Sequence, residues 1–105
     1  MTTQWQLVTP EAGLEGPASS GKPTYEQLSE SVGGYIEYVE LAPSYARELE
    51  ALYELPITAT YVNEEARLMP ERFAFNQLAT SMLHARYGAF ILGCMVIVFS
   101  DEEES

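Results

Sequence analysis

The chain has 105 residues, 47 % hydrophobic and 11 % aromatic, which is enough for one folded domain but not for a two-lobed enzyme with a deep interdomain cleft. Sixteen acidic residues against five Lys and Arg give a formal net charge of −11, which argues against nucleic acid or an anionic membrane as the main partner. A single cysteine, Cys94, and an N-terminus without a signal-peptide pattern predict a soluble, cytoplasmic protein.

Short runs of β-branched, aromatic and apolar residues indicate strands. The expected strands cover residues 4–9, 35–41, 57–62, 66–69 and 89–99. The last of these is the most apolar, so we expect it at the centre of the sheet with both faces covered. The stretch 11–22 is rich in Gly, Pro, Ala and Ser and predicts a mobile loop, and residues 101–105 predict a disordered acidic tail.

Apolar residues at helical spacing predict helices over residues 25–32, 44–55 and 73–86. Thr24 and Gln27 form a capping box at the start of the first helix, and Gly33 supplies the left-handed residue that ends it. Ser44 is the expected N-cap of the second helix, before a shared apolar face. That face comprises Tyr45, Leu49, Leu52 and Tyr53.

The alternation of these elements, joined mostly by short loops, predicts one α+β domain over residues 1–100. We expect a single small sheet of about four strands, mixed or antiparallel, with helices packed on one face. The leading specific topology is the ferredoxin-like order β-α-β-β-α-β. The sequence contains no internal repeat.

Four segments, in this order along the chain, resemble the small bacteriophage and mobile-element family called domain of unknown function 3846. They are residues 32–37 (VGGYIE), 61–65 (YVNEE), 76–80 (NQLAT) and 91–93 (ILG). The resemblance spans about residues 24–99. It implies a phage or plasmid accessory protein that works in the cytoplasm of a bacterial host, and it transfers no catalytic residue.

The partner surface that we expect combines the apolar face of the second helix with the turn after strand 57–62. Tyr offers rigid amphipathic area and is enriched at interfaces, and Asn suits a turn. The predicted partner-binding residues are Tyr45, Leu49, Leu52, Tyr53, Asn63, Glu64 and Arg67. The alternative for the helical face is ordinary packing on the sheet, and for the turn it is a hairpin with surface ion pairs.

Two other binding hypotheses compete with protein docking. Arg67, Arg72 and Asn76 could form a small pocket that sequesters a nucleotide signal. Alternatively, the carboxylates could mimic DNA phosphates, although four of the acids lie in the tail and leave only −7 on the folded part.

Catalytic and cofactor motifs are absent from the sequence: it has no phosphate-binding loop, dinucleotide fingerprint, HExxH helix or GxSxG elbow. His84 and Cys94 could form a nucleophilic dyad, but a thiol in such an apolar run is usually buried and unreactive, and two residues cannot close a zinc site. We therefore expect a non-enzymatic protein without cofactor or metal, which binds and blocks a host protein in host takeover or counter-defence. An edge strand such as 35–41 could also pair with a second copy in a homodimer.

Overall fold

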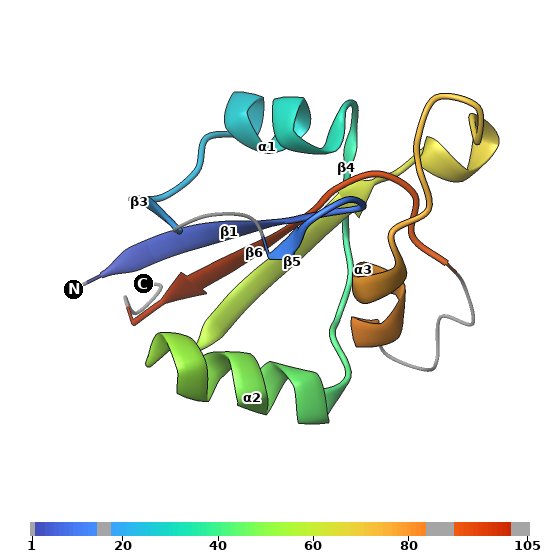
Figure 1. Cartoon of the computed structure of the whole chain (residues 1–105). Coiled ribbons are helices and arrows are strands. Elements are labelled where there is room, and N and C mark those ends of the chain that lie inside the picture. The colour runs from blue at the N-terminus through green and yellow to red at the C-terminus, as the bar shows by residue number, and fades with distance from the viewer. Residues whose placement is uncertain (1, 15–17, 84–89, 102–105) are drawn as a thin grey trace.

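The computed structural model describes residues 2–14, 18–83 and 90–101, which form an α+β fold around one open antiparallel sheet (Figure 1). The strands are β1 (Thr3–Thr9), β2 (Gly13–Leu14), β3 (Ser19–Ser20), β4 (Ile36–Tyr38), β5 (Ile57–Asn63) and β6 (Met95–Ser100). The helices are α1 (Tyr25–Val32), α2 (Pro43–Tyr53), the 3₁₀ turn η1 (Ala66–Leu68) and α3 (Gln77–Met82). No helix among these residues has the length and apolar character needed to span a bilayer.

The sheet has the strand order β2-β1-β6-β5-β4, with β3 also paired to β1. It contains six strands rather than about four, because β2 and β3 are short pairings from within the expected loop 11–22. The ferredoxin-like arrangement is not confirmed, since β6 lies between β1 and β5. The α+β class and the antiparallel sheet are as predicted.

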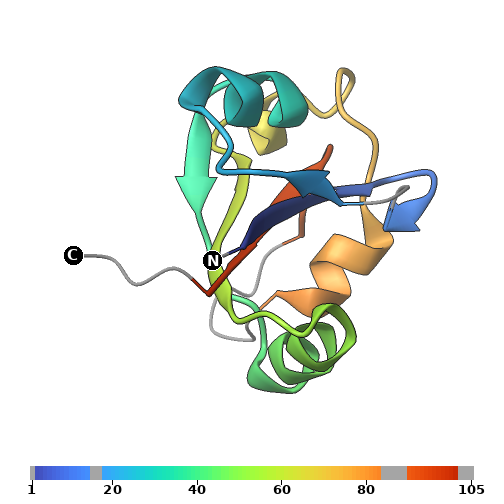
Figure 2. The same ribbon diagram turned by 90° about the vertical axis from the view of Figure 1, so that its left-hand side faces the viewer.

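Helices cover both faces of the sheet, which corrects the prediction that they pack on one face. Figure 2 shows α1 on one side of the sheet and α2 and α3 on the other. The α1 face buries Leu28 and Val32 against β6. The opposite face holds the larger apolar cluster, to which α2 contributes Leu49 and α3 contributes Met82. This two-sided cover follows from β6, whose side chains are apolar on both of its faces.

Strand β6 is the centre of the structure, and every one of its residues is buried. Alternate side chains point to opposite faces of a strand. Val96 and Val98 accordingly meet α1, while Met95, Ile97 and Phe99 join the larger cluster. The prediction of a central strand covered on both faces is confirmed, with the paired segment beginning at Met95 rather than at residue 89.

Helix α1 follows its local sequence signals. The Thr24 hydroxyl accepts a hydrogen bond from the Gln27 backbone N–H at 3.1 Å, and the Gln27 side chain accepts one from the Thr24 N–H at 2.9 Å. Gly33 ends the helix in the left-handed conformation at φ 84°. Both ends of the helix are therefore fixed by the residues that predicted them.

Several other boundaries differ from the prediction. The expected strand 35–41 forms a strand only over β4 (Ile36–Tyr38), and the expected helix 44–55 ends at Tyr53. Helix α2 begins at Pro43 with Ala42 as its N-cap, not Ser44, because proline is well suited to the first helical turn. Residues 66–69, expected as a strand, form η1 instead. Helix α3 begins at Gln77 and ends at Met82, because Leu83 is already extended, so it is shorter at both ends than the expected helix 73–86. Most of the acidic tail lies outside the described residues.

Candidate functional site

The predicted docking stripe on α2 is divided between core and surface. Leu49 is buried in the larger cluster, and Tyr45 and Tyr53 pack against that cluster. The Tyr53 ring stacks on Phe99 with ring centroids 4.2 Å apart, and burial raises the pKa of its hydroxyl above the ordinary value of 10.0. Leu52 alone projects outward, with 70 % of its surface exposed. Three of the four residues are thus core contacts, and the prediction that all four form one accessible face is wrong.

Asn63 is a structural residue in the turn after β5. Its side-chain Nδ2 donates to the Val32 carbonyl at 3.1 Å, and its Oδ1 accepts from the Glu65 backbone N–H at 2.8 Å. The side chain is buried. It therefore ties the turn to the end of α1, while its predicted neighbours Glu64 and Arg67 are exposed.

Asn76, predicted as a ligand-binding residue, is fully buried with three hydrogen bonds. Its Oδ1 accepts from the Ala79 N–H at 3.0 Å and so caps α3, while Nδ2 donates to the carbonyls of Val8 at 3.0 Å and Gly93 at 2.8 Å. A ligand could reach Asn76 only by breaking these bonds. Asn76 therefore supports the fold, which overturns its assignment to a nucleotide pocket.

Phe73 packs between two glycines that are sixty positions apart in the sequence. A Cβ atom on Gly33 would lie 2.9 Å from Phe73 Cε1, and one on Gly93 would lie 3.0 Å from Phe73 Cδ1. Both glycines have positive φ. We call Gly33, Asn63, Phe73, Asn76 and Gly93 the junction. Side-chain packing and hydrogen bonds from side chains to the backbone hold these residues together.

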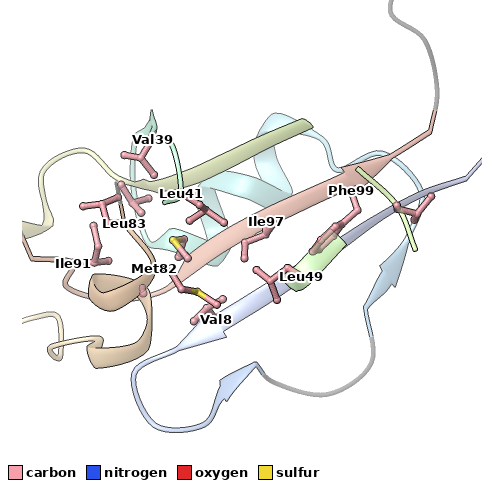
Figure 3. Close-up of a cluster of buried hydrophobic side chains, with 13 residues drawn as sticks. Val8, Val39, Leu41, Leu49, Met82, Leu83, Ile91, Ile97 and Phe99 are labelled. Carbon is pink, nitrogen blue, oxygen red and sulfur yellow. The ribbon is translucent and has the colours of Figure 1, made fainter. Parts of the chain in front are cut away.

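A cavity of about 120 Å³ opens beside the junction, and we call it the η1 cavity. Three of its lining residues carry polar side chains: Glu37 on β4, Asn63 at the end of β5, and Arg67 on η1. The rest of the lining is apolar and comprises Val39, Val62, Ala66, Leu83, Phe90, Ile91 and Leu92. Figure 3 shows Val39, Leu83 and Ile91 gathered at one end of the core cluster, opposite to Phe99.

Charge and apolar surface are both available at the mouth of this cavity. Glu37 and Arg67 are exposed, and no side-chain hydrogen bond or ion pair joins either of them to another described residue. Phe90 is 49 % exposed, and its ring centroid lies 6.4 Å from that of Phe75, which is 53 % exposed. Leu68, next to Arg67 on η1, is 79 % exposed. We call Leu68, Phe75 and Phe90 the apolar rim.

The residues of the predicted ligand pocket do not come together. Arg67 lines the η1 cavity, Asn76 is buried in the junction, and Arg72 points its guanidinium toward the Met69 sulfur at 3.7 Å. Sequence reasoning therefore identified Arg67 but missed Glu37 and Phe90. Glu37 and Phe90 lie far apart in the sequence, and no sequence pattern predicts that they line one cavity. The pairing of β4 with β5 and the return of residues 90–92 bring them together.

The described part of this site has groups suited to binding, namely apolar side chains and the two charged residues at the mouth of the cavity. No group of three or more His, Cys, Asp and Glu residues that could hold a metal ion occurs among the described residues. Cys94 is partly buried, and His84 lies outside the described residues. The nucleophilic dyad of Cys94 and His84 that the sequence suggested therefore falls partly outside the part of the chain that the structure describes. The chain matches no protein-family model, no curated protein and no solved structure.

Proposed function

We propose that this chain is a non-enzymatic binding protein that docks another protein through the η1 cavity and the apolar rim. One observation carries the proposal: a cavity lined by seven apolar and three polar residues opens beside the exposed Phe90, which contacts the exposed Phe75. Exposed large apolar residues that cluster together are typical of interaction sites, whereas isolated ones are not informative. Among the exposed Leu and Phe residues in the described ranges, Phe90 lines the cavity, Phe75 contacts Phe90, and Leu68 follows the lining residue Arg67 on η1, whereas Leu52 lies on α2.

The size of the cavity favours a partner's side chain over a nucleotide. Cavities that bind drug-sized ligands measure roughly 300–1,000 Å³, and an engineered apolar cavity of about 150 Å³ holds benzene. A volume of about 120 Å³ therefore suits one aliphatic side chain or one phenyl ring. Interface hot spots commonly consist of such a side chain in a desolvated pocket. The nucleotide-sponge alternative receives no support from this volume.

The distribution of carboxylates gives no support to DNA mimicry. Exposed acids occur on α1, at Glu26 and Glu30, and on α2 and at its C-cap, at Glu48 and Glu54, and the two helices cover opposite faces of the sheet. A phosphate mimic needs its charges in a row on one surface, with one charge per about 1.7 Å of duplex axis. The exposed acids on α1 and those at α2 therefore do not share one surface, as such a row would require.

The partner that we propose is a bacterial host protein, which the bound chain would block. This part of the proposal depends on the resemblance to domain of unknown function 3846, and hence on a phage or mobile-element origin. The cavity and its rim supply the means of attachment. Occlusion of the partner's own surface is then sufficient for inhibition, and no chemistry by this chain is required.

A matched pair of leucines tests the proposal. Leu68, which follows the cavity-lining Arg67 on η1, and Leu52, on α2, are 79 % and 70 % exposed, so an Asp at either position leaves the core unchanged. Immobilised wild-type chain and Leu52→Asp should retain the same protein from a bacterial lysate, and Leu68→Asp should lose it. Retention by both variants, loss by both, or no retained protein at all would contradict docking at the η1 cavity.

A further inference from the structure

We propose that the η1 cavity recognises a peptide segment in which one apolar side chain lies between a basic and an acidic residue. The apolar side chain enters the cavity, the basic residue meets Glu37, and the acidic residue meets Arg67. This inference rests on the proposed function and names the chemistry of the partner.

The interior of the cavity selects an apolar anchor. Val39, Ala66, Leu83 and Ile91 line it, and each is buried to at least nine-tenths. The one polar lining residue that is buried, Asn63, already bonds Val32 and Glu65. A polar group pushed into this lining would lose its hydrogen bonds to water without full replacement, which is unfavourable. Leu, Ile, Met and Phe side chains match both the volume and the lining.

The two charged residues at the mouth of the cavity select charged residues on either side of the apolar anchor. Glu37 is fixed on β4 by its pairing with Val62 on β5, and Arg67 belongs to η1, so the two charges come from separate elements around one opening. Neither is neutralised by another side chain among the described residues. A ligand that brings one charge of each sign complements both residues, whereas a ligand with two like charges opposes one of them. Complementary charges of this kind chiefly set specificity and register.

A segment of chain fits this site better than a free amino acid. The apolar surface continues past the cavity through Phe90 to Phe75, which a ligand of one residue could not cover. In an extended segment, side chains two positions apart lie about 7 Å from each other on the same side. Charged residues within about two positions of the anchor can therefore flank the mouth while the segment crosses the rim.

Selection from a displayed library of random seven-residue peptides tests this inference on the full chain. Wild type should enrich peptides with one apolar residue between one basic and one acidic residue. Arg67→Glu should exchange the acidic flank for a second basic one, and Glu37→Lys should exchange the basic flank for a second acidic one. Peptides selected on wild type should bind Arg67→Glu about fivefold more weakly or worse. Arg47→Glu, which makes the same charge change at an exposed site on α2, should leave selection unchanged.

Two further variants separate this inference from the proposed function. Ala66→Leu fills the cavity, and Leu68→Asp alters the rim without touching the core, which keeps the test valid if Ala66→Leu does not fold. One outcome would overturn the inference and leave the proposed function standing. In that outcome, the selected peptides lose binding to Ala66→Leu and Leu68→Asp, but wild type, Arg67→Glu and Glu37→Lys all select the same flanking charges. Peptides that ignore Ala66→Leu and Leu68→Asp would overturn both. Thermal stabilisation by free leucine or phenylalanine, without any enriched peptide, would assign the cavity to a small molecule and also overturn the inference.

Discussion

The junction and the η1 cavity are neighbours that share Asn63, but their polar side chains differ in burial and in hydrogen bonding. In the junction, the side chains of Asn63 and Asn76 are buried, and their Nδ2 groups donate to backbone carbonyls on distant segments. Around the cavity mouth, Glu37 and Arg67 are exposed and unpaired among the described residues. The polar residues that look most distinctive in the sequence therefore hold the chain together, and the ordinary surface charges are the ones available for recognition.

The same division into structure and surface occurs within α2, where it gives the largest expected effect. Leu49→Asp places a carboxylate in the core, and we expect a loss of more than about 4 kcal/mol in the free energy of unfolding, enough to unfold a marginally stable domain. Leu52→Asp should change it by less than about 0.5 kcal/mol. Urea unfolding followed by circular dichroism measures both. Equal effects at the two positions would contradict the placement of α2.

Asn76→Ala tests the junction directly. It removes the N-cap of α3 and leaves the Val8 and Gly93 carbonyls without their side-chain donor, so we expect a loss of about 3–5 kcal/mol. Gln77→Ala, one residue along at an exposed position, is the control and should be nearly neutral. If Asn76→Ala lowers the free energy of unfolding as little as Gln77→Ala does, the Asn76 hydrogen bonds do not hold the junction together. Asn76 could then bind a ligand, and the contrast between junction and cavity would be wrong.

Two glycines separate backbone strain from close packing in the junction. Gly21 and Gly33 both have positive φ, at 88° and 84°, but a Cβ on Gly21 meets open space whereas one on Gly33 meets Phe73. Gly21→Ala should cost about 1 kcal/mol for the left-handed conformation, and Gly33→Ala about twice as much. Similar losses in thermal or urea unfolding would mean that Phe73 moves aside and does not clamp the junction.

The smallest expected effect is a pH dependence at Tyr53, a predicted docking residue that packs on the core. Because burial raises its pKa in the folded chain, the stabilising contribution of the neutral hydroxyl is complete below about pH 10 and falls as pH rises through the folded pKa. Tyr53→Phe keeps the stacking on Phe99 and removes this titration. Wild type should lose stability faster than Tyr53→Phe above pH 10, and parallel curves would show that Tyr53 is exposed.

Local signals were sufficient for some elements because their causes are local. The capping box and Gly33 fix both ends of α1, and the apolar run of residues 89–99 predicts a strand buried on both faces, of which residues 95–99 belong to β6. The 3₁₀ turn at residues 66–68 was missed because a short run with apolar residues and a following proline suits a strand equally well. Strands β2 and β3 could not be predicted within residues 11–22, because strands of two residues leave no periodicity in the sequence.

The α2 stripe shows why helical spacing could not identify the surface. Successive residues turn by about 100°, so Leu52 lies about 60° from Leu49 and about 100° from Tyr53 around the helix. Such an angular range fits one apolar stripe, yet the sheet buries only its part near Leu49 and Tyr53. The edge of contact depends on where the helix sits on the sheet, and that is a tertiary property. For the same reason, nothing in the sequence placed Glu37 and Phe90 around one cavity.

The central claim is that a protein partner sits over the η1 cavity, and site-specific photo-crosslinking tests it most directly. A photoreactive amino acid would replace Leu68 in one sample and Leu52 in another, in full-length chain expressed in bacteria. We predict a discrete crosslinked product from position 68, lost when Ala66→Leu fills the cavity, and none from position 52. Crosslinking at position 52 alone, at both positions equally, or at neither would contradict the claim.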